Sequence, residues 1–150
     1  MPAKPIQVVA AADRGTTNYT PAYIDNKKGV LDVEGYVPKE TILNTGAAKV
    51  MLSKTFAAAM NINAQALSRG TDYITASGAI ERPLGVTKNK VKFTFSRGTP
   101  QMWTVELEAT IVDTTAYDVL LGMEFITAMC GAYDAYTEMF TYRWREARGH

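Results

Sequence analysis

The residues of this 150-residue chain with the clearest capacity for chemistry lie in the turn Asn44-Thr45-Gly46. Two apolar residues precede it, so a buried strand is expected to end in a sharp turn that presents a short polar side chain. A carboxylate at that point could take a proton from water as a general base. The amide of Asn44 has no titratable proton, although it keeps the size and most hydrogen bonds of aspartate. Position 44 therefore decides whether the chain can perform this chemistry.

A second segment, further along the chain, complements this turn. Leu120-Leu121-Gly122 follows Tyr117-Asp118-Val119 and ends a mostly apolar strand. Taken alone, Asn44-Thr45-Gly46 is typical of an ordinary turn, because Asn and Gly are standard turn residues. With Ile42-Leu43 before it, Ala47 after it and the distant apolar pair with glycine, an active-site origin becomes the better interpretation.

This combination resembles the retroviral-type aspartic proteases, the retropepsins, and most closely the form found in gypsy-type retrotransposons and their domesticated relatives. The family pattern has Asp-Thr/Ser-Gly-Ala where this chain has Asn44-Thr45-Gly46-Ala47. A flap hairpin follows, then an apolar pair with glycine before a short helix, as in Leu121-Gly122-Met123-Glu124-Phe125. Gly131-Ala132-Tyr133-Asp134 resembles the gypsy-type ending. The resemblance covers residues 28–144, and its departure is the catalytic residue itself.

The resemblance implies a mechanism in which a water molecule lies between two aspartates that share one proton. Two adjacent carboxylates cannot both ionise cheaply, so one acts as base on the water and the other donates to the developing oxyanion. The implied catalytic set is Asn44, in place of aspartate, with Thr45 and Gly46. With an amide at position 44, the site is expected to keep its shape and to be inactive.

The resemblance also implies partners. A two-lobed enzyme carries two such loops, whereas this chain has one, so the second must come from another copy in a two-fold homodimer. The implied ligand is an extended peptide or protein segment, bound mainly through its main chain. The implied substrate-binding residues are Ala47 and a flap tip formed by Thr75, Ala76, Ser77, Gly78 and Ala79, for which an ordinary exposed hairpin is the alternative. Leu120, Leu121 and Gly122 are assigned to support of the active loop.

Two further questions stay open at this point. Asn44 is explained either by a deliberate Asp-to-Asn change that stops self-digestion or traps substrate, which we favour, or by a natural non-catalytic module for peptide binding or dimerisation. Asp113-Thr114-Thr115-Ala116 also follows an apolar strand end and retains a carboxylate. It lacks the glycine that a tight turn would require, so it is the weaker candidate.

Composition and charge fit one ordinary globular domain, with 47% apolar and 21% charged residues and a formal net charge of +1. A net charge this small gives no electrostatic attraction to nucleic acid or to an anionic membrane, so neither partner is expected. Arg143, Arg145 and Arg148 are assigned to a solvated end. Cys130, expected as a small core residue, and the terminal His150 supply no metal cluster and no Ser-His-Asp mechanism, so no metal and no cofactor are expected.

The chain shows no secretory signal and no long apolar run, so it is expected in the cytoplasm or within a retroelement particle, and not secreted. Its organisation is predicted as an extended or flexible N-terminal arm over 1–27, a retropepsin-like domain over 28–144 and a flexible tail over 145–150. Flanking polyprotein that masks or tethers the dimer is an alternative for the two ends.

Alternating apolar patterns predict an all-β domain, a closed or folded β barrel with one or two short helices and the acid-protease fold as a homodimer. The expected helices start after Ser53, which caps a helix through Met60, and at Glu124. The expected strands and hairpins are a hairpin over 29–43 that turns at Pro38-Lys39, a strand over 50–52, a hairpin over 73–80, strands over 86–95, 102–112 and 117–121, and a final hairpin over 133–144.

Overall fold

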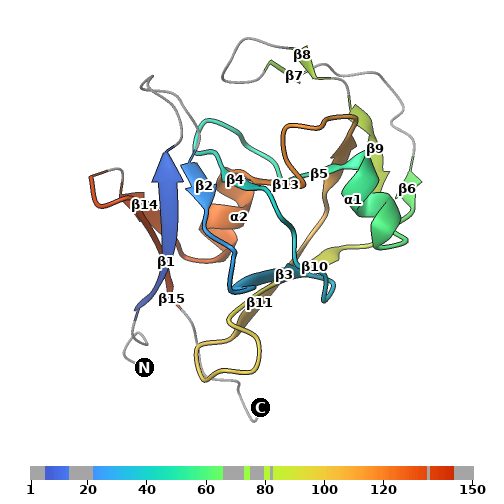
Figure 1. Ribbon diagram of the computed structural model, residues 1–150. Helices are drawn as coiled ribbons and strands as arrows, with labels where there is room; N and C mark the ends of the chain where they lie inside the picture. Colours follow the sequence, from blue (N-terminus) through green and yellow to red (C-terminus); the bar gives the residue numbers. More distant parts are fainter. Residues whose placement is uncertain are drawn as a thin grey trace.

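The computed structural model describes residues 6–13, 22–65, 73–74, 80–81, 83–134 and 136–143, with the backbone alone for 6–13, 73–74 and 80–81. In that part of the chain the fold is built from short strands and two short helices (Figure 1). The elements are β1 (Ile6–Asp13), β2 (Ala22–Ile24), β3 (Leu31–Val33), β4 (Thr41–Leu43), β5 (Met51–Ser53), α1 (Lys54–Ala59), β6 (Ala64–Gln65), β7 (Tyr73–Ile74), β8 (Ile80–Glu81), β9 (Pro83–Thr87), β10 (Val91–Phe95), β11 (Trp103–Leu107), β12 (Thr110–Val112), β13 (Val119–Leu121), α2 (Met123–Ala128), β14 (Ala132–Asp134) and β15 (Met139–Arg143).

The described strands form one large sheet and two small ones. The 10-stranded sheet has the order β14-β15-β1-β2-β4-β13-β5-β12-β9-β6, the 3-stranded sheet β11-β10-β3, and β7 pairs with β8. The all-β class with short helices is therefore confirmed, and the described pairing runs as an open order from β14 to β6. Of the range predicted as an N-terminal arm, β1 and β2 are paired strands of the large sheet; the domain boundaries themselves stay predictions.

The centre of the large sheet has an interleaved connection. β13 lies between β4 and β5, parallel to β4 and antiparallel to β5 (Figure 1). The chain leaves β4 and returns in β5, so the loop over residues 44–50 must cross the end of β13. All three strands are buried at every position, as expected for short, nearly continuous apolar runs.

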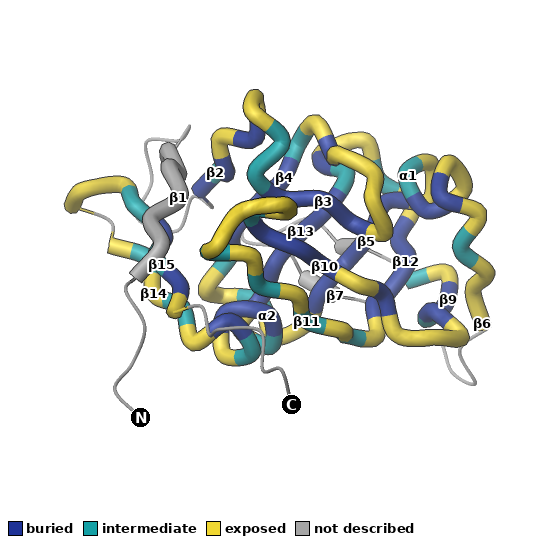
Figure 2. Tube along the Cα trace, turned by 90° about the horizontal axis from the view of Figure 1, so that it is seen from below, coloured by how far each residue is buried: buried dark blue, intermediate teal, exposed yellow. Residues whose placement is uncertain are grey.

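Because successive side chains of a strand point to opposite faces, these strands feed two cores. The main core includes Leu43, Leu52 and Leu121 together with an aromatic group from other elements. The minor core on the other face consists of Ile42, Met51, Val112, Tyr117 and Leu120, with Tyr23 and Ala47 packed against it. Figure 2 shows the buried stretches along β10, β13, β5 and β12, with exposed turns around them.

Aromatic rings join the small sheet, α2 and the last strand within the main core. Phe125 of α2 meets Phe93 and Phe95 of β10 edge to face, with ring centroids 5.6 and 5.9 Å apart. Phe95 also stacks on Tyr142 of β15 at 5.0 Å. Such pairs contribute on the order of 1 kcal/mol each beyond their buried area, so α2 is fixed against the 3-stranded sheet.

Several expected elements are confirmed. Ser53 caps α1 by accepting a hydrogen bond from the Phe56 amide at 3.1 Å, and the helix ends at Ala59 with Met60 as its C-cap. The second helix runs one residue earlier than predicted, over Met123–Ala128. The hairpin over 73–80 is formed by β7 and β8, and the final hairpin by β14 and β15.

The predicted hairpin over 29–43 is wrong. β3 pairs with β10, whereas β4 pairs with β2 and β13, so the two strands belong to different sheets. The turn lies at Glu34 and Gly35, whose φ angles of 50° and 84° suit a tight turn. Alternation indicates that a segment is a strand but does not identify its partner, which here comes from much later in the chain.

The predicted strands over 86–95 and 102–112 are each split. Lys88–Lys90 separates β9 from β10, and residues 108–109 separate β11 from β12. β9 and β12 belong to the large sheet, while β10 and β11 belong to the 3-stranded sheet. The alternating pattern continues only through the second bend, where Leu107, Ala109 and Ile111 all face the main core. At the first bend it is interrupted, because residues 88–90 are all exposed.

Tyr142 supplies a titratable test of this packing. Its hydroxyl is buried, donates to the Gln101 carbonyl at 3.2 Å and lies 2.9 Å from Ser96 Oγ, which must then donate to it. Burial raises the pKa of Tyr142, and the hydrogen bond from Ser96 lowers it in part. The unfolded chain therefore releases this proton first as the pH rises, and the contribution to stability is lost above about pH 10.

We expect Tyr142→Phe to lower the free energy of unfolding at neutral pH by about 1 kcal/mol, through loss of the buried hydrogen bonds. The same variant should lose less additional stability than the parent chain as the pH rises past about 10, since one late-titrating group is gone. Urea unfolding at matched pH values measures both effects. Identical pH dependence in the two proteins would contradict this account.

Candidate active site

Asn44 begins the loop that leaves β4. Its side chain is half-buried, whereas Thr45 and Gly46 are exposed. Asn44 Oδ1 accepts a hydrogen bond from the Gly46 amide at 2.9 Å, and the Asn44 carbonyl accepts one from the Ala47 amide at 3.1 Å. The side chain is thus held against the backbone of its own turn by an acceptor oxygen, an arrangement that a carboxylate could make equally well.

The loop is fastened to the end of β13 and the start of α2. The Asn44 amide donates to the Leu121 carbonyl at 3.0 Å. On the far side of the loop, the Ala47 and Ala48 carbonyls accept from the amides of Met123 and Glu124 at 2.7 and 2.9 Å. The first amides of a helix lack partners within it, and α2 has no side-chain cap. The loop carbonyls therefore cap α2 while α2 holds the loop.

Gly122 makes this contact possible. A Cβ atom at Gly122 would lie 2.4 Å from the Lys49 carbonyl oxygen and 2.7 Å from that of Ala47, which are backbone atoms that cannot move aside. The two residues before it divide between the cores: Leu121 lies in the main core and Leu120 in the minor core beside Ile42. The structure thus brings Leu121 and Gly122 against the Asn44 loop, and it places Leu120 in the minor core against which Ala47 packs.

Ala47 and the predicted flap differ in how far the structure describes them. Ala47 is half-buried and packs against the minor core. β7 and β8 pair antiparallel, with Ile74 opposite Ile80. The predicted tip between them, Thr75, Ala76, Ser77, Gly78 and Ala79, lies outside the described residues. Substrate binding by these residues stays a prediction.

Strand direction separates the rival acid from the Asn44 loop. β12 is parallel to β5, with Val112 beside Ser53, so Asp113 lies beyond the Ser53 end of the sheet. Asn44 lies at the opposite end, beyond Leu43 and its partner Leu121. β5 and β13 are antiparallel, which fixes this opposition. Asp113 is exposed there and does not join Asn44.

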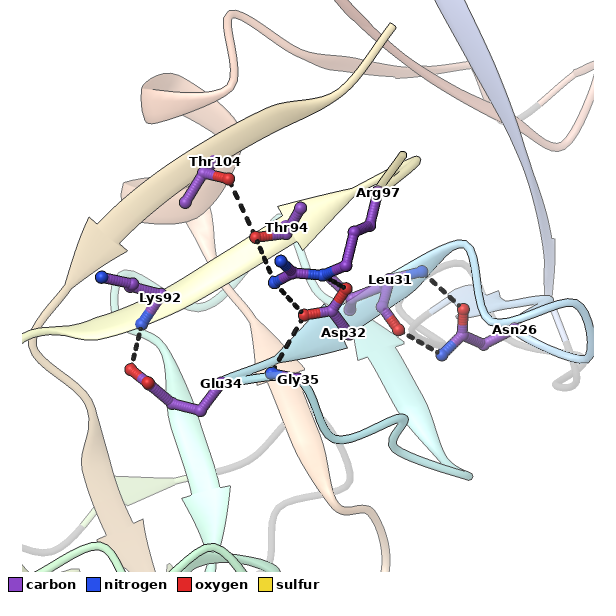
Figure 3. Close-up of polar contacts among 9 residues, drawn as sticks. All are labelled: Asn26, Leu31, Asp32, Glu34, Gly35, Lys92, Thr94, Arg97 and Thr104. Atoms are coloured by element: carbon purple, nitrogen blue, oxygen red, sulfur yellow. Dashed lines mark hydrogen bonds and ion pairs between the residues drawn. The ribbon is translucent and has the colours of Figure 1, made fainter. Parts of the chain in front are cut away.

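A polar cluster around the buried side chains of Asp32 and Asn26 was not anticipated from the sequence (Figure 3). The Asp32 carboxylate accepts from Arg97 Nε and Nη2, both at 2.8 Å, and from the Gly35 amide at 3.1 Å. The hydrogen bond with Asp32 and then its charge raise the pKa of Arg97. The available signal was an acid between two apolar residues of a buried strand, which requires a partner.

Asn26 forms the second part of this cluster. Its Nδ2 donates to the Leu31 carbonyl at 2.9 Å, and its Oδ1 accepts from the Leu31 amide at 2.7 Å (Figure 3). Nδ2 also donates to the Pro38 carbonyl at 3.2 Å. The Asn26 side chain therefore makes with Leu31 the two hydrogen bonds that a neighbouring strand would otherwise make at the start of β3. Both parts of the cluster hold main-chain segments in place, and neither contacts the Asn44 loop through a described hydrogen bond.

Two other expectations concern Cys130 and metal binding. Cys130 is exposed, with φ of 50°, just after α2, so its assignment to the core is wrong. The C-cap of α2 is Met129, and its side chain is the one that is buried. Within the described residues, no three His, Cys, Asp or Glu side chains gather as a metal site, and no helix has the length and apolarity to cross a bilayer.

The Gly122 contact leads to a matched pair of substitutions. Gly122→Ala should lower the free energy of unfolding by about 3 kcal/mol, because its Cβ meets backbone oxygens. Gly46→Ala places its Cβ 3.2 Å from the movable Asn44 Oδ1, so stability should change by less than about 1 kcal/mol. Chemical denaturation measures both, and equal losses in the two variants would contradict the assignment.

Two solved structures share the fold of this chain. The chain resembles the retroviral protease-like domain of Ddi1 from Leishmania major with a TM-score of 0.51 and 9% identity, over 78% of this chain and 90% of that one. It also resembles a retropepsin-like aspartic protease from Rickettsia conorii with a TM-score of 0.50 and 15% identity, over 96% and 97% of the two chains. Identities this low show the fold alone. No curated protein sequence matches the chain.

The family comparison covers the two segments that carry the site. The model of the family described as gag-polyprotein putative aspartyl protease matches residues 31–128, which is more than half of the chain. This range includes the Asn44 loop, β13 with Gly122, and all of α2. The chain therefore belongs to the gag-polyprotein aspartyl protease family and has a retropepsin-like fold.

Proposed function

We propose that this chain is an aspartic endopeptidase domain of the retroviral or retrotransposon type that, with asparagine at position 44, binds peptide without cleaving it. The observation that carries the proposal is Asn44, in a loop held by Leu121 and Gly122 where the family pattern has the catalytic aspartate. The ancestral substrates would be polyprotein or cytosolic protein segments. The loss of cleavage concerns the chemistry at position 44 and leaves the surrounding loop intact.

The chemistry follows from the side-chain atoms. An aspartate in the place of Asn44 would keep the hydrogen bond from the Gly46 amide through one oxygen, and that bond favours its ionised form. The other oxygen would accept a proton from the attacking water, while a second, protonated carboxyl would donate to the peptide oxygen. An amide oxygen is too weak a base for the first role, and an amide does not supply the acidic proton of the second.

The second position 44 would come from a second copy of the chain. One copy supplies one such loop, and a two-fold axis would bring the two loops together in an isologous contact. The exposure of Thr45 and Gly46 supports this proposal, because these residues would then meet the partner or the ligand. An extended peptide would lie across the paired loops, near Ala47 and under a flap with its tip at 75–79.

The test is the Asn44→Asp variant. We expect it to cleave peptides at least about 100-fold faster than the present chain, because a general base and acid are restored. Cleavage of a broad peptide library at mildly acidic and neutral pH, with products identified by mass spectrometry, measures the gain. Pepstatin should abolish it, and sedimentation should show a dimer for both proteins.

Two control variants sharpen the result. Asn44→Ala should remain inactive, and Asp113→Asn added to Asn44→Asp should leave cleavage unchanged, because Asp113 lies at the other end of the sheet. A folded, dimeric Asn44→Asp protein that cleaves nothing in the library would instead favour the non-catalytic peptide-binding or dimerisation module. A monomer would contradict the shared site.

A further inference from the structure

Asp118, which immediately precedes β13, contacts both strands that carry the Asn44 loop. Its Oδ2 accepts from the Lys39 amide at 2.8 Å and lies 3.4 Å from the Glu40 amide. Its own amide donates to the Glu40 carbonyl at 2.8 Å, and its carbonyl accepts from the Ser53 amide at 2.9 Å. One residue therefore holds the entry to β4 and the end of β5.

These bonds act where the strand pairing itself is weakly specified. β4 and β13 are parallel and only 3 residues long, with Thr41 opposite Val119 and Leu43 opposite Leu121. A slip of one residue would turn Ile42 away from the minor core, so the apolar pattern excludes it. A slip of two residues would preserve the faces yet move Asn44 along β13 by about 6.6 Å.

The carboxylate of Asp118 selects one of these arrangements. Side-chain bonds to the amides of Lys39 and Glu40 are made only when residue 40 lies beside residue 118. Hydrogen bonds to an ionised acceptor are stronger than neutral ones. The neighbouring Tyr117 hydroxyl lies 3.5 Å from Met51 Sδ on β5, so the same short segment is also held on its other side.

We propose that Asp118 is a positioning residue for position 44. By fixing the register of β4 on β13, it sets where Asn44 meets the Leu121 carbonyl and where the loop carbonyls meet the start of α2. Its effect on the loop is independent of catalysis. Its effect on turnover rests on the proposed function, because it requires an aspartate at position 44.

Amide hydrogen exchange, measured with asparagine at position 44, tests whether Asp118 positions the loop. Asp118→Ala should accelerate exchange of the Asn44 and Met123 amides, which donate to Leu121 and Ala47, on the order of tenfold more than that of Phe93 in β10. Asp118→Asn keeps an acceptor oxygen and should retain most of the protection. Tyr142→Phe serves as the control, since it weakens packing remote from the loop. Unchanged exchange at Asn44 and Met123, or equal acceleration at all three amides, would overturn the proposal.

Kinetics in the Asn44→Asp background tests the second part. Adding Asp118→Ala should lower kcat by about 10-fold to 100-fold with KM changed by less than about twofold, because the catalytic group is misplaced while peptide contacts remain. Adding Asp118→Asn should restore most of kcat, and adding Tyr142→Phe should leave it unchanged. An active Asn44→Asp enzyme that is indifferent to Asp118→Ala refutes the positioning role in turnover.

The two measurements separate the two proposals. If Asn44→Asp is inactive but Asp118→Ala releases the Asn44 and Met123 amides, the proposed endopeptidase function fails and the loop-positioning role stands. If Asn44→Asp cleaves peptide and Asp118→Ala changes neither exchange nor kcat, the function stands and the positioning role fails.

Discussion

The arrangement of this domain depends on one close contact, in which the loop after β4 crosses the junction of β13 and α2. The backbone carbonyls of Ala47 and Ala48 accept hydrogen bonds from the first amides of α2. A side chain at position 122 would collide with the loop backbone, so glycine is required there. The contact satisfies polar groups on both sides at once, which matters because the start of α2 has no side-chain cap. It lies at the centre of the large sheet, where β13 runs between β4 and β5.

The rest of the fold supports this crossing from both faces. Leu121 and Phe125 anchor β13 and α2 in the main core, where Phe125 contacts two rings of the small sheet. Leu120 anchors the other face in the minor core. Polar contacts act at the edges, where Asn26 and the Asp32–Arg97 pair fix the small sheet. Apolar burial thus holds the layers together, and a few directional bonds set the register of strands only a few residues long.

The local features of this fold could be predicted from the sequence because they depend on residues that are neighbours in the chain. Ser53 is a helix cap that is followed by apolar residues at helical spacing, and Gly122 stands between an apolar pair and a helix. Strand partners could not be predicted in the same way. Leu31–Val33 and Thr41–Leu43 are both three-residue strands buried at every position, yet one pairs with β10 and the other with β13. Only contacts between distant residues distinguish them, and alternation carries no information about such contacts.

The same limit explains why Asp118 and Asp32 escaped notice while Asn44 did not. Asn44 has a sequence context, formed by Thr45, Gly46 and Ala47, whereas Asp118 acts on the amides of Lys39 and Glu40, which are remote in the chain. At each position the available signal was an acid within or beside a buried strand. Its role could not be predicted, because it depends on which backbone groups the fold brings next to the carboxylate.

Position 44 itself makes only a modest demand on the fold. The bonds that hold it use the main chain and one side-chain oxygen, which both aspartate and asparagine provide. In the proposed homodimer, two aspartates would have to share one proton to avoid a contact between like charges, and two amides would not. Folding and assembly therefore place little constraint against asparagine here. Only the proton transfer proposed for the parental enzyme separates the two residues.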